Sequence, residues 1–291
     1  MHDALRQRWN ADALQRDLAP LRPGLAVEVV NSLASTNSAL LERARAGHAA
    51  PCLLVAETQT HGRGRHGKHW HSAPAASLTF SLSLALAAND WSGLSLAVGL
   101  ALAEALDAPA GSPPRGHAPG IVLKWPNDLM RVGPENLPRK LGGILIESMP
   151  LPPPLAPQRI AVIGIGLNIA PSPDAPPSLL SQGYASLQEL HAGMTPPQAL
   201  ARLAAALLAM LEAFERHGFA ALRNRYAARD GLFGQPVTTT LAHLPQGVAD
   251  GIADDGALWL LHAGQRHRIA SGEVSVRQCA AAGAAAGWPA C

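Results

Sequence analysis

Short apolar segments, separated by glycine, proline and polar residues, recur through the first half of this chain and predict a β-sheet. The clearest is Ser77–Leu86, where leucine or phenylalanine stands at every second position, a pattern typical of a half-buried strand. Five other segments are expected to form strands: Leu25–Leu33, Cys52–Thr58, Ile121–Trp125, Leu141–Glu147 and Ile160–Leu167.

Helical spacing marks four more segments: Asp3–Leu18, Ala39–Ala46, Trp91–Leu106 and Pro196–Ala228. The second follows a cluster of N-cap residues, Ser35, Thr36 and Asn37, and stops before Gly47, a suitable C-cap. The last is expected to break near Gly218. Together with the strands, these segments predict an α+β fold, a mixed β-sheet with flanking helices.

The pattern changes after Asp230. Pro236–Arg277 consists of short strand-like segments with turns at residues 244–247, 254–256 and 263–264, which is typical of a small β-barrel or meander. We therefore expect a larger domain over residues 1–230, a β module over 231–279, and a disordered tail rich in alanine and glycine over 280–291.

Composition argues against several classes of protein. Asn89 and Asp90 interrupt the best apolar run, so no membrane-spanning helix is expected. The first residues lack the apolar core of a secretion signal. The three cysteines, Cys52, Cys279 and Cys291, are widely spaced, so neither a disulfide framework nor a zinc site is expected, and a cytoplasmic location is the default.

Lysine is scarce in this chain. Lysine and arginine together number 23, yet only Lys68, Lys124 and Lys140 are lysines. A GC-rich genome encodes arginine wherever either cation serves, so the positions that keep lysine are candidates for roles that a planar guanidinium cannot fill. Chance placement is the alternative.

The segment from Gln59 to Trp70 lies between two predicted strands. Its core, GRGRHGK at residues 62–68, alternates glycines, which let backbone N–H groups approach an anion, with cations that neutralise it. It is neither a Walker A loop nor a Rossmann fingerprint, because no helix follows it. The spacing fits an anion-binding loop and, equally, a flexible solvated loop or a segment that touches nucleic acid.

Three further segments lie at strand ends or inside strands. KWPND at residues 124–128 gathers a cation, an amide and a carboxylate where sheet proteins commonly bind ligands, although a surface turn is the alternative. The glycines of RKLGGILIE, residues 139–147, suggest close backbone approach. GIGLN, residues 164–168, leaves a flat strip without side chains, although alone it fits a bulged core strand.

No nucleophile or metal site stands out in the sequence. The 12 histidines lack HxH or HExxH spacing, and there is no GxSxG elbow. What remains is an anion-handling site of lysine, arginine, glycine and amides. Such a site suits phosphoryl or adenylyl transfer, where positioning and charge neutralisation do most of the catalysis.

Six segments, in this order along nearly the whole chain, resemble the biotin–protein ligase family: Ser35–Asn37, GRGRHGKHW (62–70), KWPNDL (124–129), KLGGILIE (140–147), GIGLNI (164–169) and SGEVSVR (271–277). The resemblance implies a class II synthetase-like biotin/lipoate ligase catalytic domain followed by an SH3-like β-barrel. It also implies two half-reactions. Biotin and MgATP form biotinyl-5′-AMP and pyrophosphate, and a lysine of a biotin carboxyl carrier protein, from acetyl-CoA carboxylase or another biotin-dependent carboxylase, then attacks the mixed anhydride.

The same resemblance assigns roles to individual residues. Lys140 would stand between the biotin carboxylate and the α-phosphate, and Lys140 and Arg65 would be the catalytic pair. The biotin end would comprise Ser35, Thr36, Asn37, Gln59, Arg63, Gly64, Arg65 and Lys140. The nucleotide end would comprise Arg65, Lys68, Trp70, Lys124, Asn127, Asp128, Asn168 and Arg277, with Trp70 and Asn168 beside the adenine and Asp128 as a Mg²⁺ contact.

Some features depart from the family pattern or leave alternatives. Only a short segment precedes the first motif, so a winged helix-turn-helix and DNA binding are not expected, and monomer and homodimer both remain open. His66 and Lys68 stand where the family often has arginine. A lipoate–protein ligase is one alternative, disfavoured by the GRGR and KWPND segments. A nucleic-acid-binding protein is another, disfavoured by the net charge of +2 and the low aromatic content of 4%.

Overall fold

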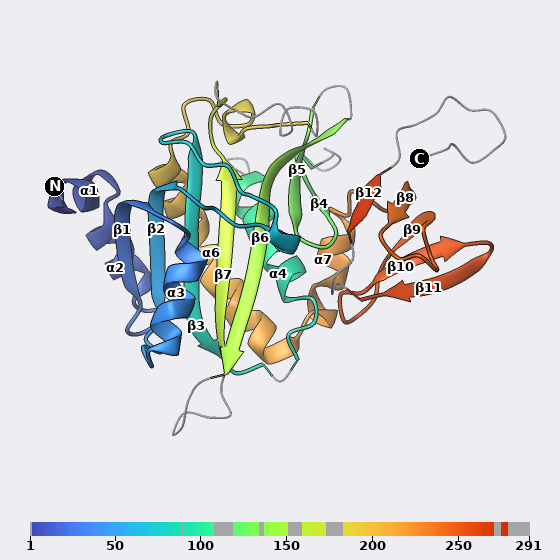
Figure 1. Ribbon diagram of the computed structural model, residues 1–291, viewed down its shortest axis with the longest axis horizontal. Helices are drawn as coiled ribbons and strands as arrows, with labels where there is room; N and C mark the ends of the chain where they lie inside the picture. Colours follow the sequence, from blue (N-terminus) through green and yellow to red (C-terminus); the bar gives the residue numbers. More distant parts are fainter. Residues whose placement is uncertain are drawn as a thin grey trace.

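A seven-stranded sheet forms the centre of the computed structural model, which describes residues 2–88, 90–107, 119–133, 137–150, 159–172, 183–270 and 275–278 (Figure 1). The tail over 280–291 and part of the SGEVSVR segment lie outside these residues. The strands are β1 (Ala26–Leu33), β2 (Cys52–Gln59), β3 (Ser77–Leu86), β4 (Ile121–Lys124), β5 (Asp128–Val132), β6 (Pro138–Pro150) and β7 (Arg159–Asn168). Their order across the sheet is β1-β2-β3-β7-β6-β5-β4.

The sheet is mixed, as predicted. β1 and β2 run parallel, whereas every other neighbouring pair is antiparallel. The longest central pairing joins β3 to β7, from Ser77 opposite Asn168 to Leu86 opposite Arg159. This pairing joins β6 and β7, which carry the KLGGILIE and GIGLNI segments, to the N-terminal strands of the sheet.

Helices cover both faces of the sheet (Figure 1). They are α1 (His2–Arg8), α2 (Ala11–Leu18), α3 (Thr36–Arg45), α4 (Leu94–Asp107), α6 (Pro196–His217) and α7 (Arg223–Ala227), with short 3₁₀ turns at Arg65–Gly67, Leu187–Glu189 and Ala220–Leu222. The break expected near Gly218 is confirmed, because α6 ends at His217. The single helix expected over Asp3–Leu18 is wrong: Asn10 adopts a left-handed conformation, with φ of 49°, and separates α1 from α2.

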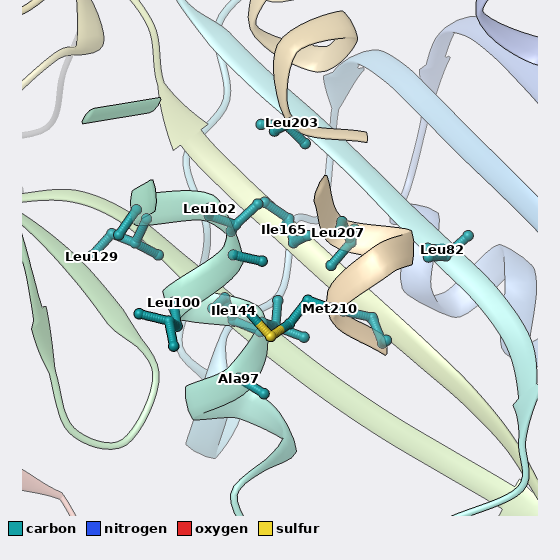
Figure 2. Packing of buried hydrophobic residues seen from close by; sticks show 14 of the residues in the cluster. Leu82, Ala97, Leu100, Leu102, Leu129, Ile144, Ile165, Leu203, Leu207 and Met210 are labelled. Atoms are coloured by element: carbon teal, nitrogen blue, oxygen red, sulfur yellow. The ribbon is translucent and has the colours of Figure 1, made fainter. Parts of the chain in front are cut away.

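β3 is buried on both of its faces, so the expectation of a half-buried strand is wrong. Its leucine and phenylalanine side chains join the large core formed with α4 and α6, part of which Figure 2 shows around Leu82, Leu102 and Leu207. Its serine and threonine side chains are buried as well; Thr79 Oγ1 donates to Ala56 O over 2.7 Å, and Ser81 Oγ lies 2.6 Å from Asn37 Oδ1. Hydroxyl groups that look solvent-facing in the sequence thus form a buried polar layer beneath α3.

The KWPND segment is the turn of a β-hairpin whose second strand the sequence did not reveal. β4 ends at Lys124 and β5 begins at Asp128, with these two residues opposite each other. Trp125, in the turn, is 1% exposed and donates through Nε1 to Gly256 O over 3.0 Å. The hairpin therefore holds the larger sheet against the C-terminal module.

The C-terminal module is a five-stranded antiparallel sheet, in agreement with the predicted β module. Its strands are β8 (Pro236–Thr239), β9 (Gln246–Ile252), β10 (Leu258–His262), β11 (Gln265–Ile269) and β12 (Val276–Gln278), in the order β11-β10-β9-β8-β12. The predicted turns at residues 244–247, 254–256 and 263–264 fall between or at the ends of these strands.

Helix α6 is the one helix in the described part of the chain that is long and apolar enough, by length and composition, to cross a membrane. The sequence predicts this helix, but its length and apolar composition were not recognised there as sufficient to cross a membrane. Its apolar face includes Leu203, Leu207 and Met210, which pack in the core against the sheet (Figure 2). The core position accounts for this composition.

Candidate active site

Most of the predicted site residues lie along one face of the seven-stranded sheet, the face on which α3 packs, and Arg277 lies on β12 of the C-terminal sheet. They form two groups. The Asn37 cluster contains Thr36, Asn37, Gln59, Ser81 and Glu147, and the cation cluster contains Arg65, Lys68, Lys124, Asp128, Lys140 and Arg277. The loop from Gln59 to Trp70 runs between the two groups.

The N-terminus of α3 places the Asn37 cluster. Ser35 is the N-cap, and its side chain accepts from Ser38 N. Thr36 donates from its backbone N–H to Gln59 Oε1 over 2.7 Å, which ties the helix start to the end of β2. Ser81 Oγ lies 2.6 Å from both Thr36 Oγ1 and Asn37 Oδ1. Buried hydrogen bonds of this kind hold the first turn in one orientation.

Asn37 is 3% exposed, and its amide is held from three sides. Its Nδ2 donates to Leu145 O over 3.2 Å and to Glu147 Oε2 over 3.0 Å, and its Oδ1 faces Ser81. Gly164 lies directly beneath it, where a Cβ atom would collide with Oδ1. The expected flat strip on β7 is therefore the floor on which Asn37 rests.

The glycine–arginine loop, residues 62–70, folds back on itself. Gly64 donates from N to Lys68 O over 2.7 Å, and Trp70 donates from N to Gly62 O over 2.8 Å. His66 and Gly67 both have positive φ, 55° and 71°, which reverses the chain at the tip. A Cβ atom on Gly62 would collide with Trp70 O, so this close approach requires glycine. The loop is thus one folded unit.

The two arginines of the loop reach different partners. Arg63 Nη2 lies 2.6 Å from Glu147 Oε1 in the Asn37 cluster, and its Nη1 donates to Ser38 Oγ over 3.1 Å. Arg65 Nη1 donates to Asn127 Oδ1 over 3.3 Å. Burial lowers the pKa of the Arg65 guanidinium, and nearby Asp128 opposes this. The loop therefore spans the site from one group of residues to the other.

Trp70 packs flat against β7 at the end of the loop. A Cβ atom on Gly166 would collide with the indole ring, so the second glycine of GIGLN is needed for this contact. Trp70 Nε1 is buried and has no hydrogen-bond partner among the described residues. Gly166 is paired with Gly143, which lies against Lys140 and Asp128, so the indole ring offers a stacking surface for a planar base beside the cation cluster.

Lysine side chains gather at the other end of the site. Lys140 Nζ lies 2.6 Å from Asp128 Oδ1, and the two side chains are 28% and 20% exposed. Burial lowers the pKa of Lys124 below its ordinary value of 10.5; Asp128 opposes this, and the cations Lys140, Lys68 and Arg277 reinforce it. Several cations therefore surround one carboxylate, an arrangement that attracts a polyanion.

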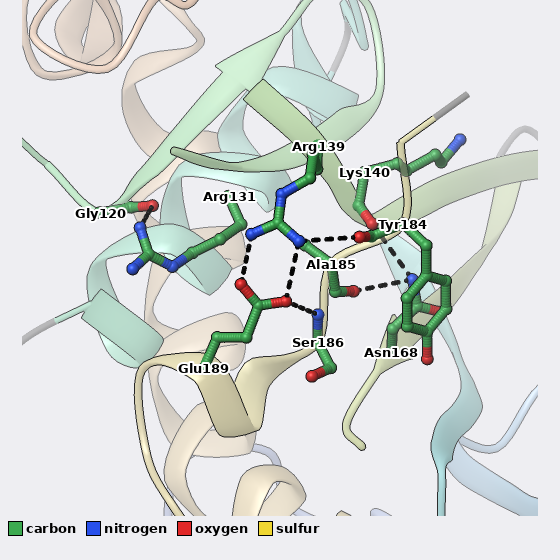
Figure 3. Close-up of polar contacts among 9 residues, drawn as sticks. All are labelled: Gly120, Arg131, Arg139, Lys140, Asn168, Tyr184, Ala185, Ser186 and Glu189. Carbon is green, nitrogen blue, oxygen red and sulfur yellow. Dashed lines mark hydrogen bonds and ion pairs between the residues drawn. The ribbon is translucent and has the colours of Figure 1, made fainter. Parts of the chain in front are cut away.

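The backbone around Lys140 is fixed by Asn168 and by the segment 183–186. Asn168 Nδ2 donates to Lys140 O over 3.2 Å and to Ala185 O over 3.1 Å, as Figure 3 shows. Lys140 N donates to Gly183 O over 2.6 Å, and Ala185 N donates to Lys140 O over 2.9 Å. An extra residue in β6 shifts the register between Leu129 and Met130. This bulge and the added strand-like segment aim the Lys140 side chain toward Asp128.

The structure brings the predicted residues together, but it gives some of them protein partners that the sequence did not suggest. The N-cap bond occupies Ser35, and the amide N–H groups of Asn37 and Asn168 donate to protein oxygen atoms. The family resemblance assigns no role to Glu147 or Ser81. Two signals were available: Glu147 ends the KLGGILIE motif, and Ser81 belongs to a row of hydroxyl residues on β3.

The cation cluster favours an anionic substrate. Within the described residues there is no group of three or more histidine, cysteine, aspartate or glutamate side chains that could hold a metal ion. Cations dominate around Asp128. The ammonium group of Lys140, paired with Asp128 among the other cations, is suited to neutralise a carboxylate and a phosphate that approach each other.

Comparison with known proteins gives consistent matches over most of the chain. A family model described as the biotin/lipoate A/B protein ligase family matches residues 29–168, and one described as the biotin protein ligase C-terminal domain matches residues 232–277. A bifunctional ligase/repressor BirA from Salmonella typhimurium is 34% identical over 86% of this chain and 74% of its own length. A biotin–[acetyl-CoA-carboxylase] ligase from Paracoccus denitrificans is 34% identical over 82% of this chain and 96% of its own.

Among solved structures, a biotin protein ligase from Aquifex aeolicus in complex with biotin and ATP superimposes with a TM-score of 0.68. The match covers 87% of this chain and 99% of that one, at 24% sequence identity. The likeness supports the fold described above, including the small sheet at the C-terminal end.

Proposed function

The chain belongs to the biotin–protein ligase family, and from this premise we propose that the site described above catalyses both half-reactions of ATP-dependent protein biotinylation. In the first, biotin and ATP give biotinyl-5′-AMP and pyrophosphate. In the second, a lysine of a biotin carboxyl carrier protein attacks the anhydride and AMP leaves. The observation that carries the proposal is the position of Lys140, paired with Asp128 and surrounded by further cations.

Lys140 provides the charge that the first step needs. A carboxylate oxygen that attacks the α-phosphorus must overcome repulsion between two anions, and an ammonium group between them removes that repulsion. The carboxylate–phosphorus bond forms as the bond to pyrophosphate breaks. Lys124, Lys68 and Arg277 lie where they neutralise the phosphates that depart.

The glycine–arginine loop protects the product. A mixed anhydride hydrolyses readily, so a loop folded over it keeps water away until the acceptor lysine arrives. Arg63 and Arg65 hold the two sides of this loop, through Glu147 and Asn127. We assign to Trp70 the adenine side of the site, since its ring lies against Gly166 and its N–H is buried without a partner in the described residues.

Magnesium enters this scheme with the nucleotide. Mg²⁺ in nucleotide sites is commonly held by one or two carboxylates and the substrate phosphates. Asp128 is the carboxylate within the cation cluster, and it fits this single-ligand role better than a preformed metal cage. We also place the reaction in the cytoplasm, in keeping with the free, buried thiol of Cys52.

The acceptor protein follows from the same reasoning. A relative carries the name biotin–[acetyl-CoA-carboxylase] ligase, and we propose a carboxyl-carrier domain of this or another biotin-dependent carboxylase as the acceptor. These named relatives, and the structure that contains biotin, favour biotin over lipoate as the acid that is activated.

The test is the exchange of pyrophosphate into ATP by the purified chain, measured with biotin or with lipoate as the carboxylic acid substrate. Biotin is expected to support exchange, and lipoate at the same concentration is not. Biotin plus ATP is also expected to raise the melting temperature more than either alone, because a tightly held adenylate stabilises the folded state. Exchange with lipoate alone would overturn the assignment of biotin.

A further inference from the structure

Glu147 connects the glycine–arginine loop to Asn37, which is fixed against the sheet. The reaction chemistry proposed above gives Glu147 no role. One carboxylate oxygen, Oε1, lies 2.6 Å from Arg63 Nη2 in the glycine–arginine loop. The other, Oε2, accepts from Asn37 Nδ2 over 3.0 Å. A single side chain thus connects the loop to the floor of the sheet.

The floor side of this connection is rigid. The second N–H of the Asn37 amide donates to Leu145 O, and Asn37 Oδ1 lies against both Ser81 and Gly164. The amide therefore cannot turn without losing a buried hydrogen bond. Its N–H group has a fixed direction, and that direction is toward Glu147.

The loop side moves as one unit. Arg63 lies between Gly62 and Gly64, which the loop's internal hydrogen bonds tie to Trp70 and Lys68. Fixing the Arg63 side chain therefore positions Arg65 and Trp70 as well. Arg63 is 47% exposed, so its ion pair adds little to the stability of the whole fold. Its effect is on where the loop lies.

We propose that Glu147 is a positioning residue that holds the glycine–arginine loop closed over the biotin end of the site, acting through Arg63 and Asn37 rather than on the substrate. This rests on the proposed function for its kinetic consequences, but the contact itself does not depend on it. Asn37 and Arg63, expected to touch biotin, act at least in part as the two ends of this connection.

Three variants test the proposal. Glu147→Ala removes both contacts, whereas Glu147→Gln keeps an oxygen acceptor for Asn37 and weakens the attraction for Arg63. Glu28→Gln is the matched control, since Glu28 is also a partly exposed carboxylate paired with an arginine, Arg43, but stands on β1 away from the loop. Glu147→Gln also guards against misfolding, because it keeps the size and hydrogen-bonding capacity of the side chain.

Trypsin gives a direct view of the loop. Arg63, Arg65 and Lys68 are cleavage sites within it, and a closed loop is cut slowly. With biotin bound, both Glu147 variants are expected to be cut in the loop about twofold to fivefold faster than the wild-type chain and Glu28→Gln, the change expected for loss of one partly exposed ion pair. An unchanged cleavage rate in Glu147→Gln and Glu147→Ala would overturn the proposal, whatever the enzyme activates.

Kinetics separate positioning from catalysis. We expect KM for biotin to rise about fivefold to tenfold in Glu147→Ala. The kcat of pyrophosphate exchange at saturating biotin should change little, and more AMP should be released without an acceptor protein. A fall in kcat with KM unchanged would make Glu147 part of the chemical step and overturn the positioning role. If exchange is absent from the wild-type chain but the trypsin result holds, the proposed function fails and the loop contact stands.

Discussion

Lys140 Nζ lies 2.6 Å from Asp128 Oδ1, across two neighbouring strands of the main sheet. Hydrogen bonds from Asn168 and from the segment that contains Tyr184 hold the backbone of Lys140 (Figure 3), and the ion pair with Asp128 holds its ammonium group. A fixed charge stabilises a developing negative charge without reorganisation at the moment of reaction. Four predictions follow from this site and its surroundings.

Lys140→Ala should lose most of the adenylation activity while keeping the fold. Removal of one preorganised charge contact commonly lowers kcat by about a hundredfold or more. The side chain is more than a quarter exposed, so its loss leaves no buried cavity. Biotin-dependent pyrophosphate exchange measures the effect, and circular dichroism checks the fold. Lys140→Arg is the informative partner variant, because a planar guanidinium cannot occupy the position of a compact ammonium group. Near-normal exchange in Lys140→Ala would refute the assignment.

Arg65→Gly should release the adenylate before transfer. Arg65 donates to Asn127 on the far side of the site from Glu147. Without the Arg65 side chain, that side of the loop loses its hydrogen bond to Asn127. Free biotinyl-5′-AMP would then react with lysines of unrelated proteins. Mass spectrometry of added albumin detects this labelling. Arg45→Gly, at the exposed last residue of α3, serves as the control. Albumin that stays unlabelled by Arg65→Gly would count against a retaining role for Arg65.

Gly166→Ala should weaken ATP binding more than biotin binding. The added Cβ atom would collide with the Trp70 ring, and the indole must move away from its place on β7. Loss of one base–aromatic stack lowers affinity by about tenfold or more. Calorimetric titration with each ligand separates the two effects. Gly133→Ala is the control, since its Cβ atom would make only an ordinary contact with Arg139. Equal losses of ATP and biotin affinity would place Trp70 elsewhere in the reaction.

As the pH is raised, ATP affinity should begin to fall at a lower pH than the ordinary lysine pKa of 10.5 would predict. Burial first, and then the cations Lys140, Lys68 and Arg277, lower the pKa of Lys124 below 10.5, while Asp128 raises it. The charged ammonium attracts phosphate and the neutral amine does not, so affinity declines as pH rises through this lowered pKa. Bound ATP favours the charged form, so binding in this range takes up a proton. Lys124→Arg should abolish the decline, and titration calorimetry in buffers of different ionisation enthalpy measures the proton uptake. A wild-type affinity that is constant up to pH 10 would contradict the prediction.

Much of the sheet could be predicted from the sequence, because its strands are short apolar segments between strong breaks. β5 could not: Asp128–Val132 starts at the last residue of a turn-like Pro-Asn-Asp sequence, and only pairing with β4 and β6 makes it a strand. The sequence pattern also did not indicate that β3 is buried on both faces. Thr79 and Ser81 resemble surface residues until α3 and the backbone of β2 supply their hydrogen-bond partners.

The site shows a similar division between local and long-range information. The motifs identified the glycine–arginine loop, KWPND and Lys140 because each is a local pattern of residue types. Glu147 was overlooked because its importance depends on register: β6 and β7 pair so that Leu145 is opposite Gly164 and Glu147 opposite Val162. This places Glu147 next to Asn37, which is far away in the sequence. No local pattern contains that relationship.

Strand β3 has a consequence for the synthesis of this protein. It is apolar on one face and buried on both, and its longest pairing is with β7. The ribosome must therefore add every residue up to Asn168 before β3 can complete this pairing. Such delayed, long-range pairing slows folding and leaves an aggregation-prone strand exposed in the nascent chain. We expect the chain to depend on a chaperone during translation, although its finished fold is stabilised by a large, continuous core.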